Sequence, residues 1–323
     1  MTGTAGGSQS HYQVIFNRLE SVSRFVPADH AAVPALQELR AILPSLSAPV
    51  LLGGGEGSPP ATPSDAIALV TLALGSMPIL NESSSGETRA MVTQILGKLE
   101  AQLGAAVRRE KADLIRGLYV IIDPQITGGR DTFTIAQAAI RGGARMLQLR
   151  DKLNDKGDSL PLARSLQKLC QESGASLIIN DHADVAAVVE SAGLHVGQTD
   201  LPVAEARKVL EHRQVVGRSN HEIEELVESE QMGTDHVAFG PIYHTGTKDV
   251  GHGPQGIDRL LVARETAKTP LVAIGGINAE NAAGVIEAGV DAICVTAAVG
   301  AAPEPEAAAA RLVKVIEDAG GRT

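Results

Sequence analysis

The feature of this chain that most constrains its fold is an alternation, repeated eight times from residue 118 onward, between a short β-branched run and an Ala-rich amphipathic segment. The eight runs are LYVIID, ARMLQLR, SLIIND, GLHVG, VVGRS, HVAFG, PLVAIG and AICVTA. The segment after each run has mostly the apolar spacing of a helix. Strand and helix alternating eight times predict an α/β fold, a (β/α)8 TIM barrel over residues 114–323. A doubly wound open sheet is the alternative, but the count of eight and the lack of a GxGxxG sequence after the first run favour the barrel.

Residues 1–113 have a different pattern, which predicts a smaller all-α domain before the barrel. The segments YQVIFNRLESVSRF, AAVPALQELRAIL and AIALVTLAL, and a long one that starts at ETRAMVTQ, carry apolar residues at helical spacing. A Gly-, Pro- and Ser-rich stretch at about residues 53–64 predicts a linker. This region contains no catalytic constellation of its own. Its role stays open between a dimerisation or docking module, which would make the protein a homo-oligomer through these helices, a decayed domain and a structural appendage.

Composition excludes several classes of protein. The formal net charge of −10 argues against general nucleic-acid binding, which needs a basic face, but it permits a local cationic pocket. The two cysteines, Cys170 and Cys294, lie in apolar runs without a second ligand at metal-binding spacing, which argues against a disulfide scaffold or a zinc site. The polar N-terminus lacks an apolar signal core, and the most apolar stretch, AIALVTLALGSMPIL, is short for a bilayer. We therefore expect a soluble cytoplasmic protein with no membrane partner.

Polar residues cluster where the predicted strands end, which is where the chemistry of such a barrel lies. These residues are Asp123, Gln148, Arg150, Lys152, Asn180, Asp181, Asp200, Ser219, His221 and Thr296, and the seventh and eighth strand ends also carry Gly275, Gly276 and Ala297. Solubility alone does not explain polar groups at nearly every strand end. No acid–base role is assigned to His221, or to His195, which is interpreted as a packed side chain.

One set of these residues indicates a site for diphosphate. In LQLRDK, Gln148, Arg150 and Lys152 share one strand face, so that two cations converge, and Lys248 adds a third. The arginine guanidinium can bind a phosphate through two parallel hydrogen bonds, and a lysine ammonium binds it as a point charge. The alternative is that these cations are ordinary solvated surface residues.

Two aspartates indicate a metal beside that site. Asp181 and Asp200 end adjacent strands, and two carboxylates brought together repel each other unless a cation lies between them. Oxygen ligands with room for water and phosphate suit Mg²⁺. The alternative is that each aspartate caps the helix that follows it.

A second anion site is expected at strands seven and eight. IGGIN and VTAA match the barrel arrangement in which backbone N–H groups and a helix N-terminus hold a phosphate, although turn-forming glycines without a ligand are the alternative. The stretch HTGTK lies in the longest barrel loop and can close over a ligand. A metal-bound diphosphate opposite a monophosphate suggests transfer of the diphosphate-bearing group to a phosphate-tagged nucleophile.

Seven motifs in order resemble one family, thiamine-phosphate synthase, also called thiamine-phosphate pyrophosphorylase. They are LQLRDK, IINDHADVA, GLHVGQTDLP, VVGRSNHEIEE, FGPIYHTGTK, AIGGINAENAAGVIEAG and VTAAV, within residues 117–318. The resemblance implies a transferase of thiamine biosynthesis that joins hydroxymethylpyrimidine diphosphate to a thiazole phosphate, gives thiamine phosphate and diphosphate, and requires Mg²⁺. It implies a dissociative mechanism, in which diphosphate leaves first and the thiazole nitrogen captures a pyrimidine cation.

The resemblance also implies roles for individual residues. The pyrimidine-diphosphate site would comprise Gln148, Leu149, Arg150, Asp151, Lys152, Asn180, Ser219 and Lys248, with Arg150, Lys152, Ser219 and Lys248 as the catalytic groups. Asp181 and Asp200 would hold Mg²⁺. The thiazole-phosphate site would comprise Thr245, Gly246, Thr247, Gly276, Thr296 and Ala297. The family usually has Val-Ser at 296–297, so we expect weaker or altered binding of the thiazole phosphate.

Two other functions compete with this one. A thiazole tautomerase on the same type of barrel would need a placed general base, for which His221 is a candidate. A non-catalytic protein that binds thiamine precursors is the second alternative. The tautomerase would not need the Gln-x-Arg-x-Lys set, the two aspartates and Thr-Gly-Thr-Lys together, and the intact metal ligands argue against the binding protein.

Overall fold

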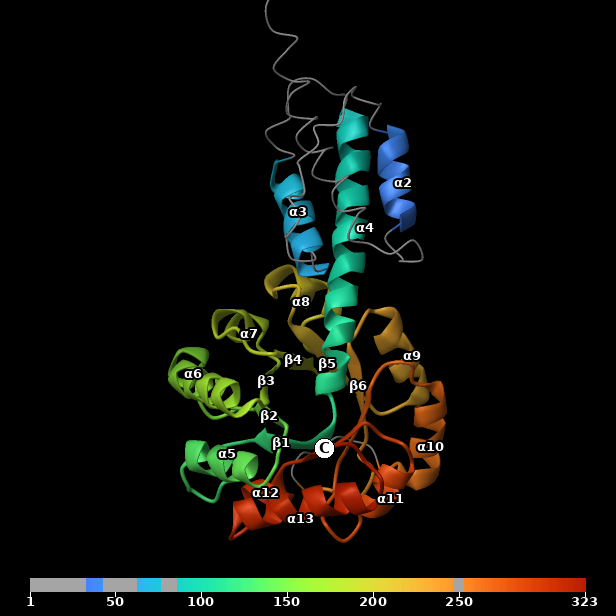
Figure 1. Ribbon diagram of the computed structural model, residues 1–323. Coiled ribbons are helices and arrows are strands. Elements are labelled where there is room, and N and C mark those ends of the chain that lie inside the picture. The colour runs from blue at the N-terminus through green and yellow to red at the C-terminus, as the bar shows by residue number, and fades with distance from the viewer. Residues whose placement is uncertain (1–32, 43–62, 77–85, 247–252) are drawn as a thin grey trace, which may run out of the picture. The chain divides into compact units, whose positions relative to one another are not determined.

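The computed structural model describes residues 33–42, 63–76, 86–246 and 253–323 (Figure 1). The chain divides into two compact units, Met1–Val107 and Arg108–Thr323. The division falls close to the expected end of the helical region at residue 113. Among the described residues, no helix has both the length and the apolar character needed to cross a bilayer.

The described part of the N-terminal unit is helical. Its helices are α2 (Val33–Ile42), α3 (Pro63–Ser76) and α4 (Gly86–Glu110), the last of which extends just beyond this unit. Among the side chains that the structure describes, α3 buries Ala66, Ile67, Val70 and Ala73, and α4 buries Val92, Ile95, Leu99 and Leu103, which recur at helical spacing. The helix expected at YQVIFNRLESVSRF and most of the expected linker lie outside the described residues. The oligomerising or docking role of this region stays a prediction.

The second unit is a closed barrel of eight parallel strands, each paired with its neighbour in chain order and β8 with β1. The strands are β1 (Gly117–Ile122), β2 (Met146–Leu149), β3 (Ser176–Asn180), β4 (Gly193–Val196), β5 (Val215–Asn220), β6 (His236–Phe239), β7 (Leu271–Ile274) and β8 (Ala292–Val295). This confirms the (β/α)8 barrel, and each predicted run overlaps a strand.

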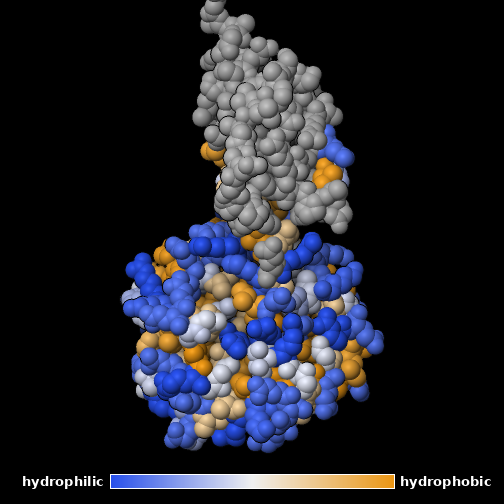
Figure 2. Space-filling model, viewed as in Figure 1, coloured by the Kyte–Doolittle hydropathy of each residue, from blue (hydrophilic) through white to orange (hydrophobic). Residues whose placement is uncertain are grey.

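Helices surround the strands (Figure 1). They are α5 (Thr132–Arg141), α6 (Lys156–Ser173), α7 (Ala183–Val188), α8 (Val203–Val209), α9 (Ile223–Gln231), α10 (Gly256–Thr266), α11 (Ala282–Glu287), α12 (Ala297–Gly300) and α13 (Pro305–Asp318), and a 3₁₀ turn, η2 (Ala112–Leu114), precedes β1. The sequence pattern did not predict α12, a single turn directly after β8. In the view of Figure 2, the barrel surface mixes mainly hydrophilic residues with scattered hydrophobic ones.

Strand alternation divides the side chains into two layers. Leu118, Val120 and Ile122 of β1 point outward into the large core under the helices, whereas Tyr119 and Ile121 belong to a smaller cluster inside the barrel. The same parity holds along β2, where Leu147 and Leu149 lie in the outer layer.

A fully buried histidine fills part of the barrel near β5 and β6. His236 of β6 lies directly over Gly217 of β5, where an added Cβ would come within 2.0 Å of its Nε2 atom. Neither ring nitrogen of His236 has a hydrogen-bond partner among the described residues. Burial, with a smaller contribution from nearby His195, lowers the pKa of His236 from 6.5 to about 3. The ring is therefore neutral at physiological pH.

We predict that Gly217→Ala destabilises the barrel by about 1–3 kcal/mol, because the new methyl group overlaps an imidazole that has no free space to move into. Urea denaturation measures the free energy of unfolding. Gly157→Ala is the matched control, since nothing lies within 4 Å of a Cβ at that position. Equal stability of the two variants would contradict this packing.

We also predict that the wild-type protein loses stability as pH falls from 6.5 toward 3 because of His236. The unfolded histidine takes up a proton in this range while the folded one does not, so protons favour the unfolded chain. In His236→Leu, the free energy of unfolding should depend less steeply on pH between 6.5 and 4.5. Identical slopes for variant and wild type, measured by urea denaturation at several pH values, would refute the assignment.

Candidate active site

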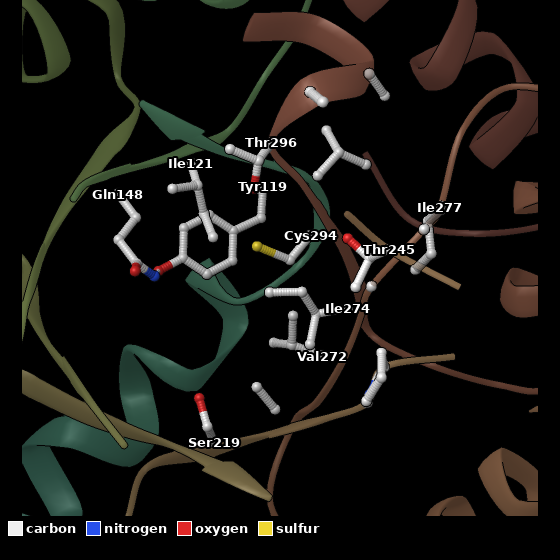
Figure 3. Close-up of a pocket in the computed structure, with 18 of the residues that line it drawn as sticks. Tyr119, Ile121, Gln148, Ser219, Thr245, Val272, Ile274, Ile277, Cys294 and Thr296 are labelled. Atoms are coloured by element: carbon white, nitrogen blue, oxygen red, sulfur yellow. The ribbon is translucent and has the colours of Figure 1, made fainter. Parts of the chain in front are cut away.

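A cavity of about 540 Å³ opens at the carboxyl ends of the strands. Its middle is apolar, with Ile121, Val272, Ile274 and Cys294 among the lining residues. Figure 3 shows Gln148 and Tyr119 on one side of this apolar patch and Thr245 and Ile277 on the opposite side. Gln148 and Thr245 thus face the cavity from opposite sides.

Nine of the predicted site residues line this cavity. They are Gln148, Arg150, Asn180, Ser219, Thr245, Gly246, Gly276, Thr296 and Ala297. Strand parity explains the set, because residues 148 and 150 point inward from the end of β2.

The Gln148 amide is held by a neighbour on β1. Its Nε2 atom donates a hydrogen bond of 2.7 Å to the hydroxyl of Tyr119, and both side chains are buried (Figure 3). Burial raises the pKa of the Tyr119 hydroxyl well above its ordinary value, so the phenol stays protonated. This bond fixes the plane of the amide at the cavity wall.

Arg150 is fixed by a buried carboxylate. Its Nη1 atom lies 2.6 Å from Oδ2 of Asp123, which is only 3% exposed and also lines the cavity. The other oxygen of Asp123 accepts the backbone N–H of Gln125 at 2.9 Å. A buried carboxylate held in this way sets the direction of the guanidinium group.

Asp181 lies beside the cavity, next to Asn180, and its carboxylate is held by an ion pair and a hydrogen bond. Its Oδ2 atom is 2.5 Å from Nζ of Lys152, its Oδ1 atom accepts a hydrogen bond from Nδ2 of Asn180 at 2.8 Å, and its backbone has a left-handed φ of 61°. Burial raises the pKa of the Asp181 carboxyl, the bond from Lys152 opposes this rise, and the Asp200 carboxyl adds to it. The structure thus brings the two predicted metal ligands into interaction.

The alternative role of these aspartates as helix caps is wrong. The N-cap of α7 is His182 and that of α8 is Pro202, and neither helix has a side-chain capping bond. Instead, Oδ2 of Asp200 accepts the N–H of Gly197 at 2.7 Å. Among the described residues, no group of three or more His, Cys, Asp or Glu side chains is placed to hold a metal. A cation at this point would therefore have two protein carboxylates and other ligands from water or substrate.

Two predicted residues lie elsewhere, and two fall outside the described residues. Leu149 points outward into the helix layer, because it is one residue out of phase with Gln148 and Arg150. Asp151 folds the loop after β2: its carboxylate accepts hydrogen bonds from the backbone of Leu153 and from the hydroxyl of Ser159. Neither side chain lines the cavity. Thr247 and Lys248 lie outside the described residues.

Ser219 is held from two directions. Its hydroxyl is 2.9 Å from Nε2 of His195, and its carbonyl accepts a hydrogen bond of 2.7 Å from Nε2 of Gln198. Arg218 in turn donates to Oε1 of Gln198 at 2.5 Å. His195 is buried, as the sequence suggested, but it also lines the cavity.

The opposite wall is made of tight turns. Gly275 and Gly276 after β7 have left-handed φ angles of 100° and 67°, and a Cβ on Gly276 would lie 2.4 Å from the carbonyl oxygen of His244. Only glycine fits that approach. After β8, Thr296 and the first residues of α12 line the same wall. The first N–H groups of a helix lack partners within the helix, so this wall offers donors suited to an anion.

Among the cavity residues that sequence reasoning did not assign to the site are Tyr119, Asp123 as the partner of Arg150, and His195. The signal for the first two was available, because residues 119, 121 and 123 share one strand face and point toward the same cavity as Gln148. The contact between His195 and Ser219 depends on strand register, which the local sequence does not reveal.

Comparison with known proteins agrees with this geometry. A family model described as thiamine monophosphate synthase matches residues 118–299. The thiamine-phosphate synthase of Moorella thermoacetica is 41% identical over 205 residues, which cover 64% of this chain and 98% of that protein. The one from Thioalkalivibrio sulfidiphilus is 43% identical over 209 residues, covering 64% of this chain and 99% of the relative.

Solved structures give the same result. A thiamine phosphate pyrophosphorylase from Pyrococcus furiosus superposes with a TM-score of 0.60 and 30% identity, covering 65% of this chain and 100% of that one. A 3-hexulose-6-phosphate synthase, at 18% identity and a TM-score of 0.50, shares the fold alone. The family match spans more than half of the chain, and the chain belongs to the thiamine monophosphate synthase family.

Proposed function

We propose that this protein transfers the hydroxymethylpyrimidine group from its diphosphate to a thiazole phosphate, giving thiamine phosphate and diphosphate. The observation that carries this proposal is one cavity with a cation, Arg150, and amides on the β2–β5 side, glycine-containing turns on the β7–β8 side, and apolar residues among its lining. Such a cavity suits two flat rings that each carry a phosphate group at opposite ends. Its occurrence in a chain of this family supports the assignment.

Charge at the diphosphate side supports a role for a divalent metal. Each described cation there is paired with a carboxylate: Arg150 with Asp123, and Lys152 with Asp181. Asp200 adds a third carboxylate, so three negative charges face two positive ones. A diphosphate would bring more negative charge to a partly buried site, at a high electrostatic cost without a further cation.

Asp181 and Asp200 fit Mg²⁺ as that cation. Both offer hard oxygen donors, and Asp200 already raises the pKa of Asp181, as expected where two carboxylates converge. Two protein carboxylates leave positions for water and diphosphate oxygens, which is how Mg²⁺ is commonly held. Bound there, the ion would neutralise charge on the diphosphate and make it a better leaving group.

The side chains then have separable roles in the reaction. Arg150 and Lys152 hold the diphosphate as the C–O bond to the pyrimidine methylene breaks and its electron pair leaves with the diphosphate. Gln148, Asn180 and Ser219 orient the pyrimidine ring. The thiazole nitrogen supplies the electron pair of the new C–N bond, so no proton must be moved. Thr245 lines the cavity, whereas Thr247 and Lys248, which lie outside the described residues, stay predicted substrate contacts.

The activity predicts that mixing hydroxymethylpyrimidine diphosphate and thiazole phosphate with the protein and Mg²⁺ yields thiamine phosphate and diphosphate in equal amounts. Mass spectrometry detects the first product and a coupled phosphate assay the second. His221 lines the cavity beside Glu225, which supports the tautomerase alternative, so isomerisation of the thiazole is monitored in the same samples. Isomerisation of the thiazole without formation of thiamine phosphate would favour the tautomerase. The absence of both products would favour a binding protein.

The metal assignment predicts that Asp181→Asn and Asp200→Asn each lower kcat/KM by about 100-fold or more, because one of two protein ligands is lost. Mn²⁺ binding, followed by electron paramagnetic resonance, should weaken in parallel. Asp184→Asn is the matched control: this aspartate lies three residues along the chain, on α7, and pairs with Lys156 at the surface. Unchanged Mn²⁺ binding and activity in Asp181→Asn would disprove the assignment.

A further inference from the structure

The loop between β1 and α5 is tightly built. Thr127 is buried and its hydroxyl donates to the carbonyl of Pro124 at 3.1 Å. Gly128 and Gly129 follow with left-handed φ angles of 64° and 81°, which turn the chain. Asp131 then caps α5 by accepting the N–H of Thr134 at 2.8 Å. Arg130 is therefore held between two anchored residues.

The Arg130 side chain contacts residues that follow the last strand of the barrel. Its Nη2 atom donates to the carbonyl of Gly300 and its Nη1 atom to the carbonyl of Ala302, both at 2.7 Å. Its Nε atom donates to the carbonyl of Thr127 at 3.0 Å. All three acceptors are backbone oxygens, and two of them belong to the end of α12 and the turn that follows it.

The short helix α12 needs such support. It consists of one turn, closed by bonds from the N–H of Gly300 to the carbonyl of Thr296 at 2.7 Å and from Ala301 to Ala297 at 3.0 Å. A single turn is unstable alone, because its few hydrogen bonds do not offset the loss of backbone freedom. A guanidinium at its last carbonyls satisfies those oxygens and places positive charge at the negative end of the helix dipole.

The other end of α12 forms part of the cavity. Thr296, Ala297 and Ala298 line the wall on which the thiazole phosphate is proposed to bind. The cavity-lining end and the Arg130 end are the two ends of one turn, so a shift at one end moves the other. An anion held by backbone N–H groups is sensitive to such shifts, since each donor must point at a phosphate oxygen.

We infer that Arg130 is a positioning residue for the thiazole-phosphate subsite: it holds α12 from behind so that the first amides of the helix point at the phosphate. This inference rests on the proposed function, because it takes the ligand of that wall to be the phosphate of the acceptor substrate. Arg130 itself touches neither substrate. Its effect is therefore selective for one of the two substrates.

The test is steady-state kinetics of Arg130→Met, which keeps an unbranched side chain out to about the position of Nε and removes every donor. We expect the KM for thiazole phosphate to rise about 10-fold while the KM for pyrimidine diphosphate stays within about twofold of wild type. Arg130→Lys, which keeps the charge and one donor group, should recover part of the loss. Arg141→Met is the matched control, since Arg141 also links two segments at the surface through a 2.7 Å bond to Glu306.

An equal rise in both KM values, or a loss of thermal stability in Arg130→Met without a selective change in KM, would overturn the inference. If Arg130→Met does not fold, the same comparison is made with Arg130→Lys and Arg130→Gln. A merely structural role predicts that Arg130→Met and Arg141→Met behave alike.

A second measurement separates this inference from the proposed function. Inorganic phosphate is titrated into ¹⁵N-labelled protein while the amide signals of Ala297 and Ala298 are followed by NMR. The inference predicts that these signals shift in wild type and need about 10-fold more phosphate in Arg130→Met. Failure of wild type to make thiamine phosphate would overturn the proposed function, whereas equal phosphate affinity at these two amides would overturn the role of Arg130.

Discussion

The cations on one wall of the cavity are already neutralised by the protein, and this pairing constrains how the site can work. Arg150 is bound to the buried carboxylate of Asp123, and Lys152 to Asp181. These pairs hold the cationic groups in defined directions, which unpaired side chains at a cavity edge would not have. They also leave little net positive charge for a diphosphate. On the proposed function, the site would take an added cation, and the convergence of Asp181 and Asp200 offers that cation a location.

The opposite wall works in a different way. It has backbone N–H groups from the turn after β7 and from α12 instead of paired side-chain charges, and it relies on glycines that let the chain come close. The backbone fixes the direction of the amide N–H groups. Their alignment toward an anion therefore depends on the contacts that hold the backbone in place. Arg130 does this for α12 from outside the cavity. Ile121, Ile274 and Cys294 give the cavity an apolar surface on which flat rings can stack.

The barrel was predictable because its signals are local and repeat. Each strand run and most helical segments are readable from a few neighbouring residues, and the eightfold repeat makes the closed sheet the simplest arrangement. Strand parity also predicted correctly that Gln148 and Arg150 enter the cavity. Leu149 and Asp151 were assigned to the site as parts of a contiguous motif, and parity shows why their side chains lie elsewhere.

What could not be predicted depends on contacts between distant segments. The bond between Tyr119 and Gln148 joins residues 29 positions apart, and the one between Arg130 and Gly300 joins residues 170 positions apart. The single turn α12 is too short to produce a periodic pattern, so its existence depends on tertiary contacts. The contact between the buried ring of His236 and Gly217 likewise depends on the register between β5 and β6, which pairs these two residues.

The most direct test of the two-walled site is a crystal structure of the protein with Mn²⁺, diphosphate and thiamine phosphate, in which anomalous scattering locates the metal. We expect one metal peak at about 2 Å from carboxylate oxygens of both Asp181 and Asp200, touching diphosphate, with the phosphate of thiamine phosphate at the amides of Ala297 and Ala298. A metal peak away from both aspartates, or diphosphate on the β7–β8 wall, would contradict the account.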